Sequence, residues 1–73
     1  MAHPSTEAVL RFFGYSHLPA GRGKEVSTEF YELAYNMATY LPEDPETTVA
    51  LRKLLEAKDA AVRAALVGDG LIS

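Results

Sequence analysis

The chain has 73 residues and no cysteine, and its ten acidic and seven basic side chains give a formal net charge of −3. The lack of cysteine excludes disulfides, thiolate catalysis and cysteine-based zinc sites in this chain, and the acidic balance argues against nucleic acid as a partner. A chain of this size forms one domain, residues 1–73, and buries only about 60–65% of its unfolded surface, so we expect a homo-oligomer to supply further stability.

Charge is distributed unevenly along the chain. From residue 8 to residue 24 every formal charge is positive, and from residue 25 to residue 46 every formal charge is negative. A local cationic segment on an acidic protein suits a small anion better than a polyanion. No apolar run is long enough for a signal peptide or a membrane span, so we expect a cytoplasmic protein with no membrane partner.

The first predicted element is a short helix of about two turns. Ser5-Thr6-Glu7 after Pro4 resembles a helix start, and Gly14 supplies a stop. A helix this short is unstable alone, so Phe12 and Phe13 need a surface to pack on. We expect both rings to anchor the N-terminal part, residues 1–25, to the rest of the chain.

A loop follows the short helix within this N-terminal part. Between Gly14 and Lys24 the sequence carries three glycines and one proline, which exclude a regular element. Aromatic and basic side chains in a loop are typical of a binding site for a stacked, phosphate-bearing ligand. The candidate ligand contacts here are Tyr15, His17, Arg22 and Lys24. The alternative is a solvated connector in which Tyr15 and Leu18 only cap the core.

The second predicted helix runs from about Val26 or Ser27 to Tyr40. Apolar side chains recur with the spacing i, i+3, i+4, i+7 and i+11 at Phe30, Leu33, Ala34, Met37 and Leu41. Three tyrosines lie beside this stripe, Tyr31, Tyr35 and Tyr40. Tyrosines at the edge of a stripe are typical of a core rim or a subunit contact, and their phenols could also serve a ligand.

The third predicted helix, Asp44 to Leu66, is the strongest element in the sequence. Asp44 suits the N-cap, Pro45 the first helical position and Glu46 the positive end of the helix dipole. The short connection from Leu41 predicts an antiparallel hairpin, residues 26–66, followed by a flexible tail, residues 67–73.

One side of this third helix is apolar over a broad sector, formed by Leu51, Leu54, Leu55, Ala61, Val62, Ala65 and Leu66 and widened by Ala50, Ala57 and Ala64. A single neighbouring helix cannot cover so wide a sector. Either the helix packs on other copies of the chain, or part of the sector holds a ligand. The opposite sector predicts a solvated ladder of ion pairs, at Arg52, Glu56, Asp59 and Arg63.

Lys58 breaks the apolar pattern because it projects near the middle of the sector. A lysine in this place must extend its ammonium to solvent, pair with a carboxylate of the second helix, or bind an anion. Lys58 is therefore the fifth candidate ligand contact. The sequence alone leaves these alternatives open.

Catalytic patterns are weak throughout the sequence. His3 and His17 are separated by the first helix, no serine lies in a nucleophile motif, and Gly21-Arg22-Gly23-Lys24 lacks the spacing of a phosphate-binding loop. We expect neither an enzyme nor a cofactor or metal site.

From Phe13 onward the layout resembles a known family, the small phage helical-hairpin proteins that counter bacterial CBASS and Thoeris immunity by sequestering cyclic-nucleotide signals. The resemblance lies in Phe13-Gly14-Tyr15-Ser16-His17-Leu18-Pro19, in Leu33-Ala34, in Pro42 and Glu46 at the turn, and in Ala50, Leu54 and the alanine-rich segment Ala57–Leu66. It covers most of the chain.

The resemblance implies an all-α protomer that assembles into a compact homo-oligomer, typically a hexamer, with ligand sites between protomers. It implies that Tyr15 packs on a base of the cyclic nucleotide and that a basic residue meets a phosphate. The family often carries that basic residue early in the second helix, where this chain has Ser27 and Thr28. Lys24 or Arg22 would then supply the charge.

The sequence therefore predicts an anti-defence protein that binds and sequesters cyclic di- or trinucleotides or a cyclic ADP-ribose type of signal. The alternative is a small oligomeric interaction module that docks a host protein through Tyr31, Tyr35 and Tyr40, with no small ligand. Single-stranded nucleic acid is a third possibility, disfavoured by the acidic second helix.

Overall fold

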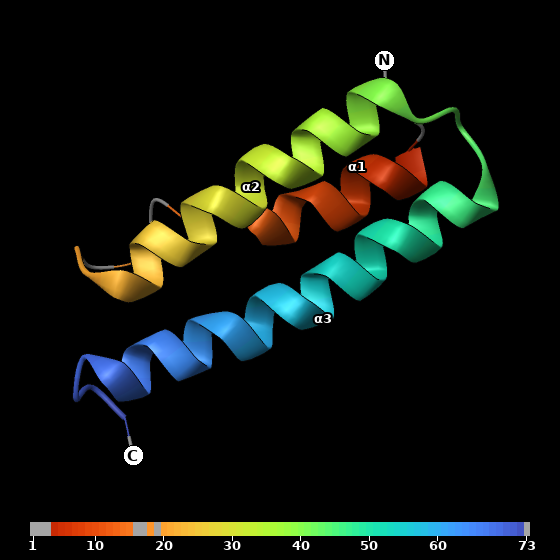
Figure 1. The fold of residues 1–73 in the computed structure, drawn as a ribbon. Coiled ribbons are helices and arrows are strands. Elements are labelled where there is room, and N and C mark those ends of the chain that lie inside the picture. The colour runs from red at the N-terminus through yellow and green to blue at the C-terminus, as the bar shows by residue number, and fades with distance from the viewer. Residues whose placement is uncertain (1–3, 16–17, 19, 73) are drawn as a thin grey trace.

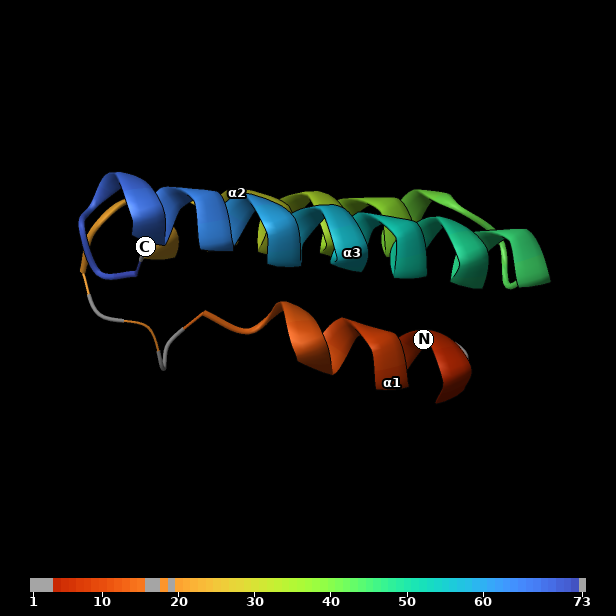
Figure 2. The same ribbon diagram turned by 90° about the horizontal axis from the view of Figure 1, so that it is seen from below.

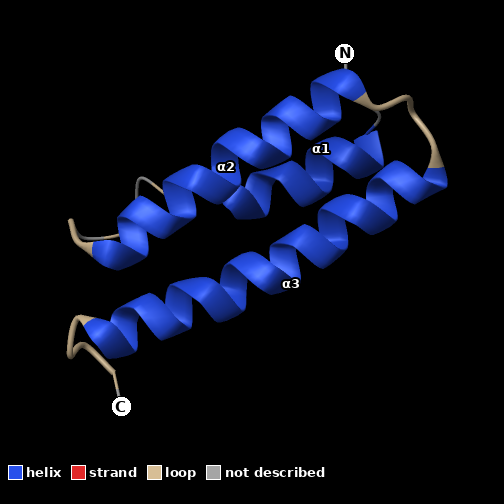
Figure 3. Cartoon of the chain, in the orientation of Figure 1, coloured by secondary structure: helices blue, strands red, loops and turns tan. Residues whose placement is uncertain are grey.

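The computed structural model describes residues 4–15, 18 and 20–72, and every regular element in them is helical (Figure 3). The elements are α1 (Pro4–Leu10), the 3-10 helix η1 (Arg11–Phe13), α2 (Arg22–Tyr40) and α3 (Pro45–Gly68). The predicted all-α class is therefore confirmed for the described part of the chain.

The long helices α2 and α3 lie side by side and antiparallel, joined by a short turn (Figure 1). The N-terminal segment, which we define as residues 4–15, lies across one face of this pair (Figure 2). The described part of the chain places no element on the opposite face. The molecule is elongated as a result, with principal extents of 40 × 18 × 16 Å.

The start of α3 follows the local sequence signals. Asp44 is the N-cap, and its Oδ2 accepts a hydrogen bond from the backbone N–H of Glu46 at 2.8 Å. Pro45 occupies the first helical position, where a missing N–H removes no helical hydrogen bond. The helix continues to Gly68, two residues past the predicted end, and the N–H of Asp69 still bonds to the Ala65 carbonyl at 2.9 Å.

The start of α2 differs from the prediction, because the helix begins at Arg22 and not at Val26 or Ser27. Its N-cap is Gly21, which has a φ of 140° and no side chain to accept a helical N–H. Asp69 supplies the missing acceptor, since its Oδ2 lies 2.9 Å from the backbone nitrogen of Arg22. Arg22 and Lys24 therefore belong to the first turn of a helix and not to a loop. The predicted flexible tail, residues 67–73, is also partly ordered, because Val67 and Gly68 are helical and Asp69 caps α2.

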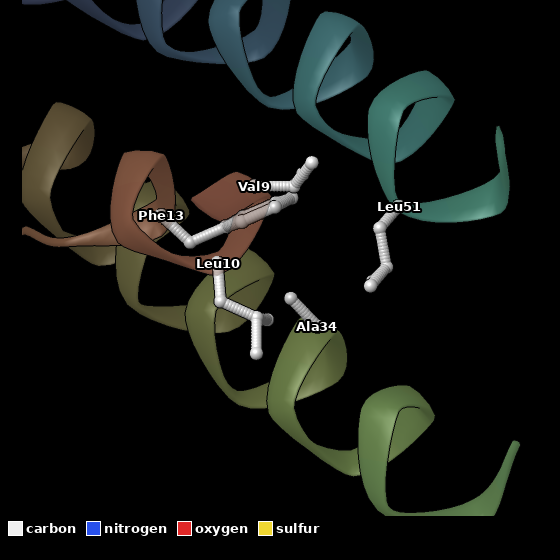
Figure 4. Packing of buried hydrophobic residues seen from close by; sticks show 5 residues of the cluster. All are labelled: Val9, Leu10, Phe13, Ala34 and Leu51. Atoms are coloured by element: carbon white, nitrogen blue, oxygen red, sulfur yellow. The ribbon is translucent and has the colours of Figure 1, made fainter. Parts of the chain in front are cut away.

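The core lies where the N-terminal segment crosses the two long helices (Figure 4). The buried side chains that meet there come from all the described elements: Val9, Leu10, Phe13, Ala34 and Leu51. Phe13 is fully buried, whereas the Phe12 side chain is 63% exposed, so the expectation that both rings anchor the segment is wrong for Phe12. Consecutive residues in a helical turn point about 100° apart, so both rings cannot face one core.

The buried line of α2 is also displaced from the predicted stripe. The buried residues of α2 are small ones, Gly23, Ser27 and Ala34, while Leu33 is 47% exposed. A Cβ atom added at Gly23 would lie only 3.0 Å from the Cδ2 atom of Leu66. Glycine at this position therefore lets α2 approach α3 closely, and Leu33, a member of the predicted apolar stripe, is exposed and not buried.

On α3 the buried line runs through Thr47, Leu51, Lys58 and Ala65. Part of the predicted apolar sector stays exposed, including Ala57 and Ala64. An exposed ion pair on this helix joins Lys53 and Glu56, with Nζ and Oε2 3.6 Å apart, rather than the predicted ladder partners Arg52 and Glu56. None of the described helices is long and apolar enough to cross a bilayer.

Candidate functional site

The N-terminal segment divides the candidate residues between two flanks of the molecule. On the α2 flank, Tyr15 meets tyrosines of α2, and we call Tyr15, Tyr31 and Tyr35 the tyrosine cluster. On the α3 flank, a hollow lies between η1 and α3, and we call it the cationic hollow. Its lining consists of Arg11, Phe12, Gly14, Leu55, Lys58 and Asp59.

The tyrosine cluster has the geometry of packed aromatic rings. The Tyr15 and Tyr31 centroids are 5.1 Å apart with the planes at 79°, an edge-to-face arrangement. Tyr31 and Tyr35, one helical turn apart on α2, have centroids 4.6 Å apart at 41°. Tyr15 and Tyr31 are half-buried and Tyr35 is 42% exposed, so part of the aromatic surface remains accessible. Tyr40 is 81% exposed and lies outside the cluster.

Lys24 shares a helix face with the tyrosine cluster. It precedes Tyr31 by seven residues, which is two turns of helix or about 10 Å along the axis. Thr28 lies between them on the same face, with its hydroxyl bonded to the Lys24 carbonyl at 2.7 Å. The half-buried Lys24 side chain therefore places an ammonium on the face where the accessible aromatic surface lies.

Arg22 points to another part of the molecule. Its Nε lies 3.6 Å from Oδ1 of Asp69, and its Nη1 lies close to Gly68 at the end of α3. The guanidinium thus joins the beginning of α2 to the end of α3 and is not brought together with Tyr15. His17, the remaining candidate from the loop, lies outside the described residues.

Lys58 occupies the middle of the buried line of α3, as the sequence predicts. The residue is only 8% exposed, and its Nζ donates a hydrogen bond to the backbone carbonyl of Phe12 at 3.0 Å. The Oδ1 atom of Asp59 lies 3.9 Å from the same Nζ atom. Of the alternatives that the sequence left open, a carboxylate partner on the second helix is not the one found, because the acceptor is a carbonyl near the end of η1, where helix carbonyls carry partial negative charge.

The cationic hollow has a volume of about 340 Å³ and was not predicted as a unit. Arg11, Phe12 and Asp59 are its exposed members, and the sequence interpretation missed Arg11 and Phe12 as site residues. Phe12 was assigned to the core, and Arg11 is a single charge in a short helix. The sequence contains no signal that places them beside Lys58, since that contact joins residues 46 positions apart.

The side chains that gather on both flanks are suited to binding. Phenol rings offer stacking surfaces, while ammonium and guanidinium groups offer donors and positive charge to an anion. In the described part of the chain, no group of three or more histidine, aspartate or glutamate side chains is arranged to hold a metal ion. Comparisons of the chain with protein-family models, with curated proteins and with solved structures find no match.

Proposed function

We propose that this protein binds and sequesters a cyclic-nucleotide immune signal at interfaces between copies of the chain, and that it is not an enzyme. The observation that carries the proposal is the tyrosine cluster with Lys24 on the same face of α2. The resemblance of the sequence to phage anti-CBASS and anti-Thoeris hairpin proteins names the class of ligand.

The roles follow from the chemistry of a cyclic nucleotide, which has flat bases and anionic phosphates. Tyr15 stacks on a base, a contact that contributes about 1–3 kcal/mol. Lys24 pairs with a phosphate through a charge-assisted hydrogen bond. His17 is an additional donor in the same loop. Arg22 joins the site only if it leaves Asp69, and Lys58, the fifth candidate contact, lines the hollow on the other flank and has no role in this site.

Assembly of several copies completes the site in this proposal. One protomer presents the tyrosine cluster at its surface, whereas a tight ligand site encloses most of the ligand. Large apolar side chains are exposed on both long helices and at the turn: Leu33, Tyr40, Leu41, Val49 and Val67. A homo-oligomer would cover such side chains and multiply the sites per particle, and the resemblance favours a hexamer.

Isothermal titration against cyclic dinucleotides, cyclic trinucleotides and cyclic ADP-ribose isomers tests the proposal. We expect one class to bind, and Tyr15→Ala to weaken it about tenfold to hundredfold through loss of stacking. Lys24→Gln should weaken binding about tenfold and reduce its dependence on salt. Tyr40→Ala is the matched control and should bind as the wild type does. Silence across the panel at high micromolar concentration would contradict the proposal.

A second candidate function is a small oligomeric module that docks a host protein through the tyrosine edge of α2. The 81% exposure of Tyr40 and the 38% exposure of the adjacent Leu41 favour it. The same variants separate the two functions. For a docking module, Tyr40→Ala weakens capture of the host partner while Tyr15→Ala leaves it unchanged, and the titrations with cyclic nucleotides show no heat of binding.

A further inference from the structure

The cationic hollow combines two positive side chains with an aromatic ring. Arg11 comes from η1 and Lys58 from α3, and both line the same space of about 340 Å³. The tyrosine cluster contacts α2, whereas Leu55, Lys58 and Asp59 line the hollow from α3. The hollow is therefore a separate surface, on the other flank of the N-terminal segment.

Lys58 retains hydrogen-bonding capacity inside this hollow. An ammonium has three donors, and within the described residues Lys58 makes one hydrogen bond, to the Phe12 carbonyl at 3.0 Å. The distance of 3.9 Å to Asp59 Oδ1 is too long for a second one. A charged group that is 8% exposed gains strongly from a further acceptor, because water reaches little of it.

Phe12 gives the hollow an apolar wall. Its side chain is 63% exposed, although burying a phenylalanine side chain is worth about 1.5–3 kcal/mol. The half-buried Leu55 lines the same space from α3. A flat apolar group placed against Phe12 would remove this surface from water while Arg11 and Lys58 face its charged end.

Asp59 is the one negative side chain in the lining, and it reduces the net positive charge of the hollow. Arg11 and Lys58 outnumber it, so the hollow as a whole attracts an anion. The Asp59 carboxylate repels that anion at short range and weakens its binding. A neutral residue at this position should therefore strengthen anion binding. Neutralising Arg11 should have the opposite effect and weaken it.

We propose that the cationic hollow is a second ligand site, which takes a small organic anion with a flat apolar group. An aryl phosphate is the simplest ligand of this class. Arg11 and Lys58 bind the anionic group, and Phe12 and Leu55 contact the ring. This site is independent of the cyclic-nucleotide proposal, because none of the tyrosine cluster belongs to it.

Titration of the full-length, ¹⁵N-labelled protein with phenyl phosphate tests this site by NMR. We expect saturable shifts of the amides of Gly14, Leu55 and Asp59 below about 10 mM ligand. Arg11→Gln should weaken binding about tenfold, and Asp59→Asn should strengthen it about threefold. Arg52→Gln, an exposed charge of α3 outside the lining, is the matched control and should change little.

Three results would overturn the proposal. These are no shift at about 10 mM phenyl phosphate, shifts that persist unchanged in Arg11→Gln, and equal affinity for inorganic phosphate, which lacks the ring. Arg11, Asp59 and Arg52 are all exposed, so we expect these variants to stay folded, and the circular dichroism spectrum checks this. A negative result with phenyl phosphate would not contradict the cyclic-nucleotide proposal, because that proposal is tested with other ligands and with variants of Tyr15 and Lys24.

Discussion

Lys58 connects the N-terminal segment to α3 through one buried contact. Its methylene chain lies in the apolar line of α3, and its ammonium meets the Phe12 carbonyl at 3.0 Å. Phe12 is followed directly by Phe13, the fully buried ring of the core, and Tyr15 of the tyrosine cluster is two residues further on. Lys58 therefore bonds to the segment that contributes Tyr15 to the tyrosine cluster and Arg11 and Phe12 to the cationic hollow.

Replacement of Lys58 by methionine should loosen this connection without unfolding the protein. Methionine keeps the apolar stem but removes a hydrogen bond from a charged donor, which is worth about 1.5–3 kcal/mol. We expect amide hydrogen exchange of residues 8–13 to accelerate about tenfold or more, while α2 and α3 exchange as before. Lys53→Met, whose side chain is 74% exposed in the native protein, should change nothing. Equal protection of residues 8–13 in both variants would contradict this role.

Single residues also show the limit of sequence-based prediction. The place of Lys58 in the apolar sector follows from helical periodicity and is confirmed. Its partner is a carbonyl 46 residues away, and periodicity carries no information about such a contact. Phe12 and Phe13 illustrate the same limit, because both are apolar and only the docking angle of η1 decides which ring is buried.

The two long helices begin by different means. Asp44 caps α3 from the adjacent position, so the start of α3 was predicted to within one residue. Gly21 cannot cap α2, and the acceptor for the Arg22 N–H comes from Asp69, 47 residues beyond Arg22. The predicted start of α2 was four or five residues too late for this physical reason. Elements with local capping signals can be predicted from the sequence, whereas those completed by tertiary contacts cannot.

The cap supplied by Asp69 gives a prediction for the element it stabilises. Asp69→Ala removes the acceptor of the Arg22 N–H and should lower the free energy of unfolding by about 1 kcal/mol. Asp69→Asn keeps an acceptor oxygen and should retain most of this stability, because the ion pair involves an Arg22 side chain that is 65% exposed. Urea unfolding of both variants measures the difference. Equal losses would show that the charge, not the hydrogen bond, stabilises the start of α2.

At the scale of the whole molecule the two faces of the α2–α3 pair are unequal (Figure 2). The N-terminal segment covers one face, and within the described chain nothing covers the other. Leu33 and Val49 are 47% and 46% exposed, although both are good core residues. Such exposure is the physical basis for the proposed homo-oligomer.

A homo-oligomer makes apparent stability depend on protein concentration. We expect the thermal midpoint to rise with concentration and sedimentation to report a mass several times that of one chain. Leu33→Asp should shift the protein toward the monomer, because it places a charge on the exposed apolar surface. Glu32→Asp, a change at an exposed acidic neighbour, is the control. A monomeric mass at all concentrations would contradict the proposed assembly.

Because the N-terminal segment crosses both long helices, its complete burial depends on both of them being present. Val9, Leu10 and Phe13 lie early in the chain, yet one of their core partners, Leu51, belongs to the last helix. During synthesis, the N-terminal segment emerges before α3, so it can reach its full core only after α3 has emerged. The pairing of α2 with α3 requires only a short turn between them, whereas α1 reaches its full core only when both long helices are present.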